Sequence, residues 1–284
     1  MWMTVHNQIF KKASKTYYYS SIFFPPEIQT KISRLYSFVR IADDYVDSVP
    51  QNKNGFLEFR SNYNRLLENP SYEAQFIYSN NLDSEIIQSF ISLIHEESFD
   101  LNWVESFLDS MQMDTEEAFV YQTMEQTKKY IYGSASVIGL FVSKILNLES
   151  ESYRGAELLG DAFQYINFIR DIAEDVSVGR CYFPQTELEK FELLNLNEGE
   201  CRAKPENFKR FIEAQVYTYS KWQLKAEDYF KFIPKKYRIA IATASDMYAW
   251  TGLEISRNPF LVFEKKVKPR KRRIFLTALK NLLK

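Results

Sequence analysis

The stretch QYINFIRDIAEDVSVGRCYFP (164–184) carries a line of amide and carboxylate side chains on an otherwise apolar segment. In an α-helix, steps of three, four and four residues place side chains on one face, and these steps separate Gln164, Asn167, Asp171 and Asp175. A polar line of this kind is costly to bury unless it has partners. It is therefore either a solvated helix face or part of a binding site.

A second polar line lies in RLYSFVRIADDYVD (34–47), on Tyr36, Arg40, Asp43 and Asp47. The apolar positions around it recur with the period of an amphipathic helix, at Ile28, Ile32, Leu35, Val39, Ala42 and Val46. Carboxylates one helical turn apart repel each other and weaken an isolated helix. Arg40 compensates in part, and a divalent cation would do so better. If the two helices face each other, their polar lines enclose a cavity with carboxylates on opposing walls.

Carboxylate and amide oxygens without a soft ligand nearby point to Mg²⁺, which shares its coordination shell with waters and substrate phosphates. The sequence therefore favours a diphosphate substrate. A zinc site, a disulfide framework and a His-based triad are excluded by the spacing and scarcity of His6, His95, Cys181 and Cys201. For either motif alone, a solvated or salt-bridged face stays the alternative.

The composition favours one large helical domain. The 284 residues include 23 Phe and 19 Tyr but only 8 Gly and 9 Pro, so core material is ample and turn residues are few. The periodicity predicts helices over 28–46, 84–95, 116–147, 155–177, 206–232 and 237–256. No secretory signal and no membrane span is evident, so we expect a cytoplasmic protein.

The charge is uneven along the chain. Residues 265–284 contain nine Lys or Arg and no acid, which leaves 27 basic and 37 acidic residues in 1–264. We expect residues 1–264 to form the helical domain and 265–284 a basic amphipathic segment. Its apolar residues, Ile274, Leu276, Leu279, Leu282 and Leu283, predict peripheral contact with an anionic membrane rather than with nucleic acid. A solvated terminus is the alternative.

The paired motifs DDYVD (43–47) and NFIRDIAED (167–175) resemble those of the squalene/phytoene synthase family, which joins two prenyl diphosphates head to head. Similar matches are SKTYYYSSIFFP (14–25), YIYGSASVIG (130–139) and VGRCYFP (178–184). Ser134 and Ser136 depart from the Val and Gly that are usual there, and 248–260 matches loosely. The resemblance implies a single-domain class I isoprenoid synthase helical bundle with a central cavity.

The resemblance also implies roles for individual residues. Mg²⁺, with Mn²⁺ as an expected substitute, would be held by Asp43, Asp47, Asn167, Asp171 and Asp175. The substrate diphosphate would be bound by Lys15, Arg40, Arg170, Arg180 and Gln164. Pairing with a neighbouring aspartate is the alternative for each cation; the phosphate role is favoured for Arg40 and Arg170, and the two roles are balanced for Lys15 and Arg180. Tyr130 would handle a proton and Tyr36 would orient Arg40, so that Tyr130, Arg40, Arg170 and Tyr36 form the expected catalytic set. The role of Asp114 stays open between a site residue and a cap.

Three products share these motifs. Two geranylgeranyl diphosphates give phytoene, which we expect here from the likeness to microbial phytoene synthases. Two farnesyl diphosphates give dehydrosqualene, or squalene if NADPH supplies a reduction. A terpene cyclase, which normally carries an Asn/Ser/Glu second motif, and a non-catalytic helical adaptor, which tends to lose the carboxylates, are the rival classes.

Overall fold

A computed structural model of the chain describes residues 4–69, 82–116 and 120–283. These residues form helices and no β-strand, which confirms the all-α prediction. The α-helices in chain order are α1 (Val5–Ala13), α2 (Lys15–Ser21), α3 (Pro26–Asp47), α4 (Lys53–Glu68), α6 (Leu82–Glu97), α7 (Leu101–Met113), α8 (Met124–Ile131), α9 (Val137–Ile145), α10 (Tyr153–Arg170), α11 (Ile172–Ser177), α12 (Gln185–Lys190), α13 (Glu198–Ala203), α14 (Pro205–Glu227), α15 (Lys235–Arg257), α16 (Leu261–Glu264) and α17 (Lys271–Leu282).

Local sequence signals set where the long helices begin. Proline occupies the first helical position of α3 and α14, where its missing N–H costs nothing and its fixed φ suits a helix. A capping box starts α8, with Thr123 and Gln126 bonded reciprocally to the backbone. The apolar stripe predicted for 28–46 is confirmed: all of its members are buried except Val39, which is half-buried.

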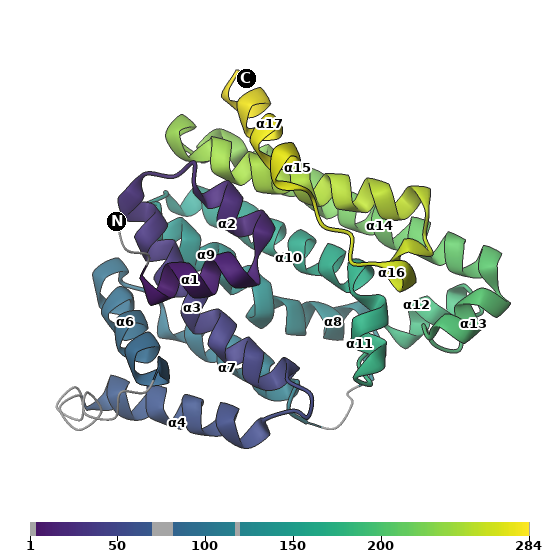
Figure 1. Cartoon of the computed structure of the whole chain (residues 1–284), viewed down its shortest axis with the longest axis horizontal. Coiled ribbons are helices and arrows are strands. Elements are labelled where there is room, and N and C mark those ends of the chain that lie inside the picture. The colour runs from purple at the N-terminus through teal and green to yellow at the C-terminus, as the bar shows by residue number, and fades with distance from the viewer. Residues whose placement is uncertain (1–3, 70–81, 117–119, 284) are drawn as a thin grey trace.

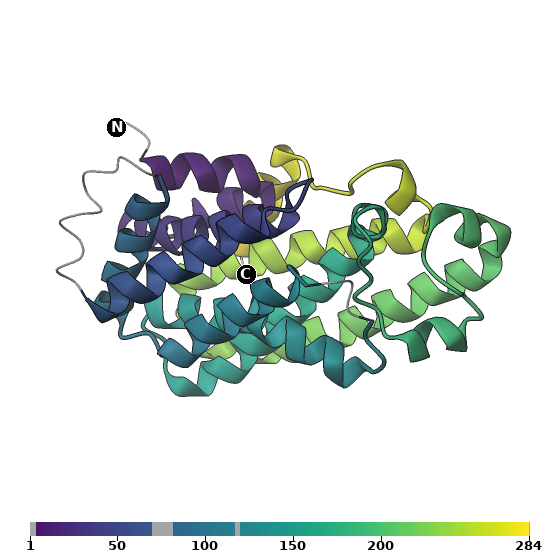
Figure 2. The ribbon, with the colours of Figure 1, turned by 90° about the horizontal axis from the view of Figure 1, so that it is seen from below.

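The helices pack around two neighbouring hydrophobic cores. One core gathers buried residues of α1, α3, α4, α6, α7 and α9, and the other gathers residues of α8, α10, α14 and α15. In Figure 1, α10, α14 and α15 lie side by side across the upper half, and α3, α4 and α7 lie below them. Figure 2 shows the green helices of the second group extending along the length of the molecule.

An apolar cavity of about 340 Å³ lies where the two groups of helices meet. Helix α10 forms one wall of the cavity by packing directly on the backbone of the preceding segment, at Ala135 and Gly139. A Cβ added at Gly160 would lie 2.6 Å from the carbonyl oxygen of Ala135, and one at Gly139 would lie 2.4 Å from that of Ala156. Between α8 and α9 the chain makes a π-helical turn at Tyr132–Ser136, and such turns often occur at functional sites.

Three predicted helices differ from those observed. The helix expected over 116–147 begins at Met124 and contains the π-helical turn, and 117–119 lie outside the described residues. The helix expected over 155–177 is divided at Asp171, whose φ of −101° and ψ of 14° leave the helical region. The segment expected over 206–232 ends as an α-helix at Glu227 and continues as a 3₁₀ turn, Asp228–Phe232.

The basic C-terminal segment is ordered and packed on the body. Val267 and Ile274 are buried, and α17 lies on α15 and α2. Ile274 was expected on an outward apolar face, and this was wrong because its side chain packs inward. The division into 1–264 and 265–284 stays a prediction. No helix within the described ranges combines the length and apolarity that crossing a bilayer requires.

Candidate active site

Five of the predicted site residues line one end of the apolar cavity. Tyr36 and Asp43 come from α3, Tyr130 from α8, and Gln164 and Asn167 from α10. Aliphatic and aromatic side chains of α1, α2, α9 and α15 line the rest of the cavity. The polar end of the cavity is thus formed by residues of both polar lines. Within the described residues Asp43 is the one carboxylate in the lining, so the expected carboxylates on opposing walls are not seen in this cavity.

On α3, Arg40 binds the first aspartate motif. Its guanidinium donates to Asp43 at 2.7 Å and forms an ion pair with Asp44. Tyr36 lies one turn earlier, with its ring 4.3 Å from that of Phe10, and burial raises the pKa of its hydroxyl. Arg40 is thus partnered by aspartates, and a phosphate would have to share it with them.

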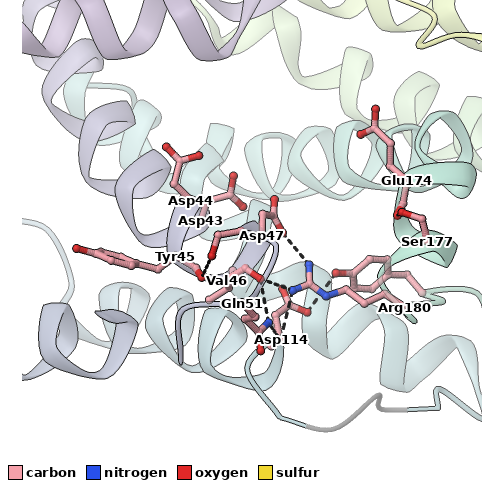
Figure 3. Close-up of polar contacts among 12 residues, drawn as sticks. Asp43, Asp44, Tyr45, Val46, Asp47, Gln51, Asp114, Glu174, Ser177 and Arg180 are labelled. Carbon is pink, nitrogen blue, oxygen red and sulfur yellow. Dashed lines mark hydrogen bonds and ion pairs between the residues drawn. The ribbon is translucent and has the colours of Figure 1, made fainter. Parts of the chain in front are cut away.

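Arg180 joins the two motifs (Figure 3). Its guanidinium donates to Asp47 at 2.7 Å and to the carbonyl oxygens of Val46 and Asp114. It follows α11, so it holds the end of α3 against the loop after the second motif. Only 15% of the Arg180 side chain is exposed but 47% of the Asp47 side chain is, so the arginine half of this ion pair is desolvated and the carboxylate half stays in contact with water.

The second motif lies where α10 ends and α11 begins. Arg170 binds Asp171 through two hydrogen bonds of 2.8 and 2.5 Å. The backbone bonds from Asp171 to Asn167 and from Asp175 to Asp171 persist across the division, so the polar line stays continuous. Lys266, from the segment before α17, lies 3.3 Å from Asp171 and also pairs with Glu174.

Asp114 lies between the two motifs and accepts two phenolic hydrogen bonds. Tyr130 donates to it at 2.5 Å and Tyr182 at 3.1 Å. The ring of Tyr182 is stacked between those of Tyr130 and Phe168. Asp114, whose role the sequence left open, thus belongs to the site. It also follows the last residue of α7 and occupies that helix's C-cap.

The carboxylates of the site repel one another. Burial, and then the charge of Asp47, raises the pKa of Asp43 to about 7 although Arg40 opposes this. Burial, followed by the charges of Asp171 and Asp47, raises the pKa of Asp175 to about 8. Burial also raises the pKa of Asp114 to about 6. Since Asp47 on α3 acts on Asp175 on α11, the two motifs are within electrostatic reach of each other.

These residues fit a divalent cation held together with a substrate. The donor set is hard oxygen, and the buried Oδ1 of Asn167 has no hydrogen-bond partner among the described residues. Within 4–69, 82–116 and 120–283, no three His, Cys, Asp or Glu side chains converge on one point. Mg²⁺ typically uses one or two carboxylates and fills the remaining positions with water and phosphate oxygens. The arrangement suits that mode better than an all-protein cage.

Not every predicted residue joins the cluster. Lys15 is exposed at the start of α2, and no contact connects it to the aspartates within the described part of the chain. Sequence reasoning gave no role to Tyr17, Tyr248 or Lys266. Tyr248 stacks on Phe163 at 4.3 Å and lies 5.7 Å, ring to ring, from Tyr17. The high aromatic content was the signal for these tyrosines, but it does not say which aromatic residues reach the site.

Comparisons with known proteins identify the family of the chain. The family model described as "Squalene/phytoene synthase" matches residues 10–273. A 15-cis-phytoene synthase of Pantoea ananas is 27% identical over 251 residues, covering 86% of this chain and 79% of that protein. A 4,4'-diapophytoene synthase of Staphylococcus haemolyticus is 25% identical over 209 residues, covering 73% and 70% respectively.

The fold agrees as well. The crystal structure of a squalene synthase from Alicyclobacillus acidocaldarius superposes with a TM-score of 0.74 at 18% identity, covering 90% of this chain and 93% of that one. The family match spans both aspartate motifs and the helices that carry them. The chain therefore belongs to the squalene/phytoene synthase family, whose members are prenyltransferases.

Proposed function

We propose that the protein condenses two geranylgeranyl diphosphates head to head and releases phytoene and diphosphate. The observation that carries this proposal is the cavity itself, which is mostly apolar but is lined by Asp43 of the first motif and Asn167 of the second. Arg40 binds Asp43, and Arg170 binds Asp171 of the second motif. An amphipathic substrate fits such a cavity in one orientation, with its diphosphate at the charged end. The likeness to phytoene synthases supports the choice of substrate.

The reaction needs the C–O bond of one substrate to break, with its electron pair leaving on the diphosphate. The double bond of the second substrate then attacks the allylic cation, and loss of a proton gives a cyclopropylcarbinyl diphosphate. A second ionisation, rearrangement and proton loss give the hydrocarbon. These cations react at once with water, so a dry cavity is required. Buried rings such as Phe10 and Phe163 supply apolar walls and faces that stabilise cations.

The protein's own residues handle the leaving group and the proton. Arg40, Arg170 and Arg180 present guanidinium groups suited to bidentate phosphate recognition. Burial keeps the pKa of the Tyr130 hydroxyl well above its usual range, so it stays protonated and can act as a hydrogen-bond donor at the charged end. Mg²⁺, held by Asp43, Asp47, Asn167, Asp171 and Asp175, would stabilise the negative charge that develops on the departing diphosphate.

A second candidate is the condensation of two farnesyl diphosphates, to dehydrosqualene or, with NADPH, to squalene. A cavity of about 340 Å³ is at the lower end of the range for small-molecule sites, which favours the shorter substrate. The likeness to a diapophytoene synthase supports the same candidate. Chain length and the need for NADPH are therefore the quantities to measure.

The test is a product assay with purified protein and Mg²⁺. Geranylgeranyl or farnesyl diphosphate is supplied with and without NADPH, and the hydrocarbon and released diphosphate are quantified. Phytoene from the longer substrate without NADPH supports the proposal, whereas squalene or dehydrosqualene from farnesyl diphosphate replaces it with the second candidate. A cyclic product from one substrate, or no diphosphate release from folded protein, would move the chain to the cyclase or adaptor class.

A matched pair of variants controls this assay. Asp171→Asn removes a motif carboxylate, and Asp161→Asn removes a carboxylate on the same helix that only Ser136 contacts through a hydrogen bond in the described structure. We expect the first variant to lose diphosphate release and the second to retain it. Equal loss in both variants would show that the effect comes from helix α10 and not from the motif.

A further inference from the structure

Helix α17 has two apolar faces, and only one of them is covered by the body of the protein. Ile274, Ala278 and Asn281 face inward, and Asn281 donates to Asp246 on α15 at 2.8 Å. This inward face fixes the orientation of the helix. Because α17 is anchored in this way, the side chains on its opposite face are held in place above the body, at the top of Figure 1.

The outward face of α17 is a row of exposed apolar side chains. Their exposed fractions run from 42% to 82%, on Phe275, Leu276, Leu279, Leu282 and Leu283. Positions 275, 276, 279, 282 and 283 lie together on one helical face. Scattered exposed leucines are ordinary, but five neighbouring apolar side chains on one surface helix mark a binding surface.

A basic groove runs beside this row, between α17, α15 and the segment after α16. It is lined by seven cationic residues, Lys265, Lys266, Lys268, Arg270, Arg272, Arg273 and Lys280. Within the described part of the chain, Lys266 is the one member of this set that pairs with a carboxylate within 4 Å. The single acid in the lining, Glu254, is paired with Arg257. The groove is therefore strongly cationic.

We propose that this combined surface, the leucine row and the basic groove, docks on a bilayer that contains anionic phospholipids. Lipid phosphates would bind in the groove while the leucines enter the acyl boundary, as interfacial amphipathic helices do. Each Lys or Arg near an anionic leaflet adds to the attraction. A nucleic acid would satisfy the charge but would leave the leucine row exposed, so a lipid surface accounts for both features.

The uneven charge along the chain determines which side of the protein faces the bilayer. Residues 1–264 carry 27 basic and 37 acidic side chains, so the body is repelled by an anionic surface while the C-terminal segment is attracted. The helices beneath α17 are α2 and α15, and both also line the apolar cavity. Docking therefore leaves α17 between the lipid and this wall of the cavity. The release of a hydrocarbon product into that lipid rests on the proposed function.

The experiment measures co-flotation of the full chain with vesicles. One set contains phosphatidylcholine alone, and the other contains about one third phosphatidylglycerol. We expect binding to the anionic vesicles only, and loss of most binding in about 0.5 M NaCl. Leu279→Ser with Leu282→Ser should weaken binding at least about tenfold, and Arg272→Glu with Lys280→Glu should do the same through charge.

The matched control is Leu224→Ser with Leu253→Ser, because these leucines are 63% and 48% exposed on α14 and α15, outside the leucine row. This variant should bind like the wild type, and circular dichroism melting shows that each variant is folded. Absence of wild-type binding, equal binding to neutral vesicles, or equal weakening by the control pair would overturn the proposal. Undiminished binding of the Leu279/Leu282 variant, together with competition by RNA, would reassign the groove to polyanions and also overturn it.

Discussion

The two aspartate motifs differ in how the fold balances their charge. The motif on the unbroken helix α3 has an arginine for every aspartate: Arg40 lies 2.7 Å from Asp43 and also pairs with Asp44, and Arg180 lies 2.7 Å from Asp47. In the motif at the α10–α11 junction, Asp171 is bound by Arg170, but Asp175 has no cation within 4 Å among the residues described. The second motif therefore keeps an unbalanced carboxylate, which an external cation would neutralise.

Ion pairing alone does not determine the pKa values of these carboxyl groups, however. Burial and the charge of Asp47 raise the pKa of Asp43 to about 7 even though Arg40 binds it, while the unpaired Asp175 reaches about 8. The difference indicates that the protein's own arginines mainly balance the charge of the first motif, whereas the charge of the second depends more on a bound cation. Four experiments separate these contributions.

The largest expected effect is on catalysis, and it falls equally on both motifs. Asp43→Asn and Asp175→Asn should each lower diphosphate release by about a thousandfold, because each removes an oxygen ligand and a charge at the leaving group. Single-turnover diphosphate release, measured at saturating Mg²⁺, checks this. A loss of activity in only one of the two variants would show that the two motifs do not contribute equally to diphosphate release.

Next in size is the effect of Tyr130→Phe, which removes the hydroxyl that donates to Asp114 between the motifs. We expect turnover to fall by about ten- to a hundredfold with little change in KM, since a positioned proton donor acts in the transition state. Tyr121→Phe is the control. The ring of Tyr121 packs on that of Tyr130, but Tyr121 does not line the cavity. Similar losses in both variants would point to a general disturbance of this tyrosine cluster and not to a specific role of the Tyr130 hydroxyl.

Stability should respond to Mg²⁺ in a pH-dependent way. The folded-state pKa values of Asp43 and Asp175 lie above the usual carboxyl value, so these groups favour folding at low pH and that contribution is lost as the pH rises through about 7 to 8. Mg²⁺ binds the ionised form, and so it should raise Tm more at about pH 9 than at about pH 6. Thermal melts with Mg²⁺ or with Na⁺ at equal ionic strength measure this. An equal gain at both pH values would contradict it.

The smallest effect distinguishes the two motifs directly. In metal-free protein at about pH 9, Asp175→Asn should raise Tm by roughly 2–4 °C, because it removes a buried and unpaired charge. Asp47→Asn should lower Tm, because it leaves the largely buried Arg180 without its carboxylate. Melting curves of the two variants and the wild type decide the matter, and changes of the same sign would refute the contrast drawn above.

The sequence predicted the helical class, the α3 stripe and the two polar lines, because periodicity and spacing are local properties. It did not predict that Arg180 reaches Asp47, since the two lie 133 residues apart in sequence. The division at Asp171 and the approach of Lys266 also depend on tertiary packing. For Asp114, a cap and a site role were the alternatives; the structure places it at the C-cap of α7, where it also accepts a hydrogen bond from Tyr130.

The close approach of α10 to the backbone at Ala135 and Gly139 has a consequence for how the cavity can evolve. At Gly139 and Gly160 the space is already filled by carbonyl oxygens, so any side chain there would force main chains apart. That wall is fixed by the backbone, and its shape is inherited with the fold. Another part of the lining, from α2, the segment after it and α15, is built from side chains such as Tyr17, Phe24 and Ile241. Substitutions that change the length of hydrocarbon accepted should therefore accumulate on the side-chain wall, which can lengthen or shorten the cavity one methylene at a time.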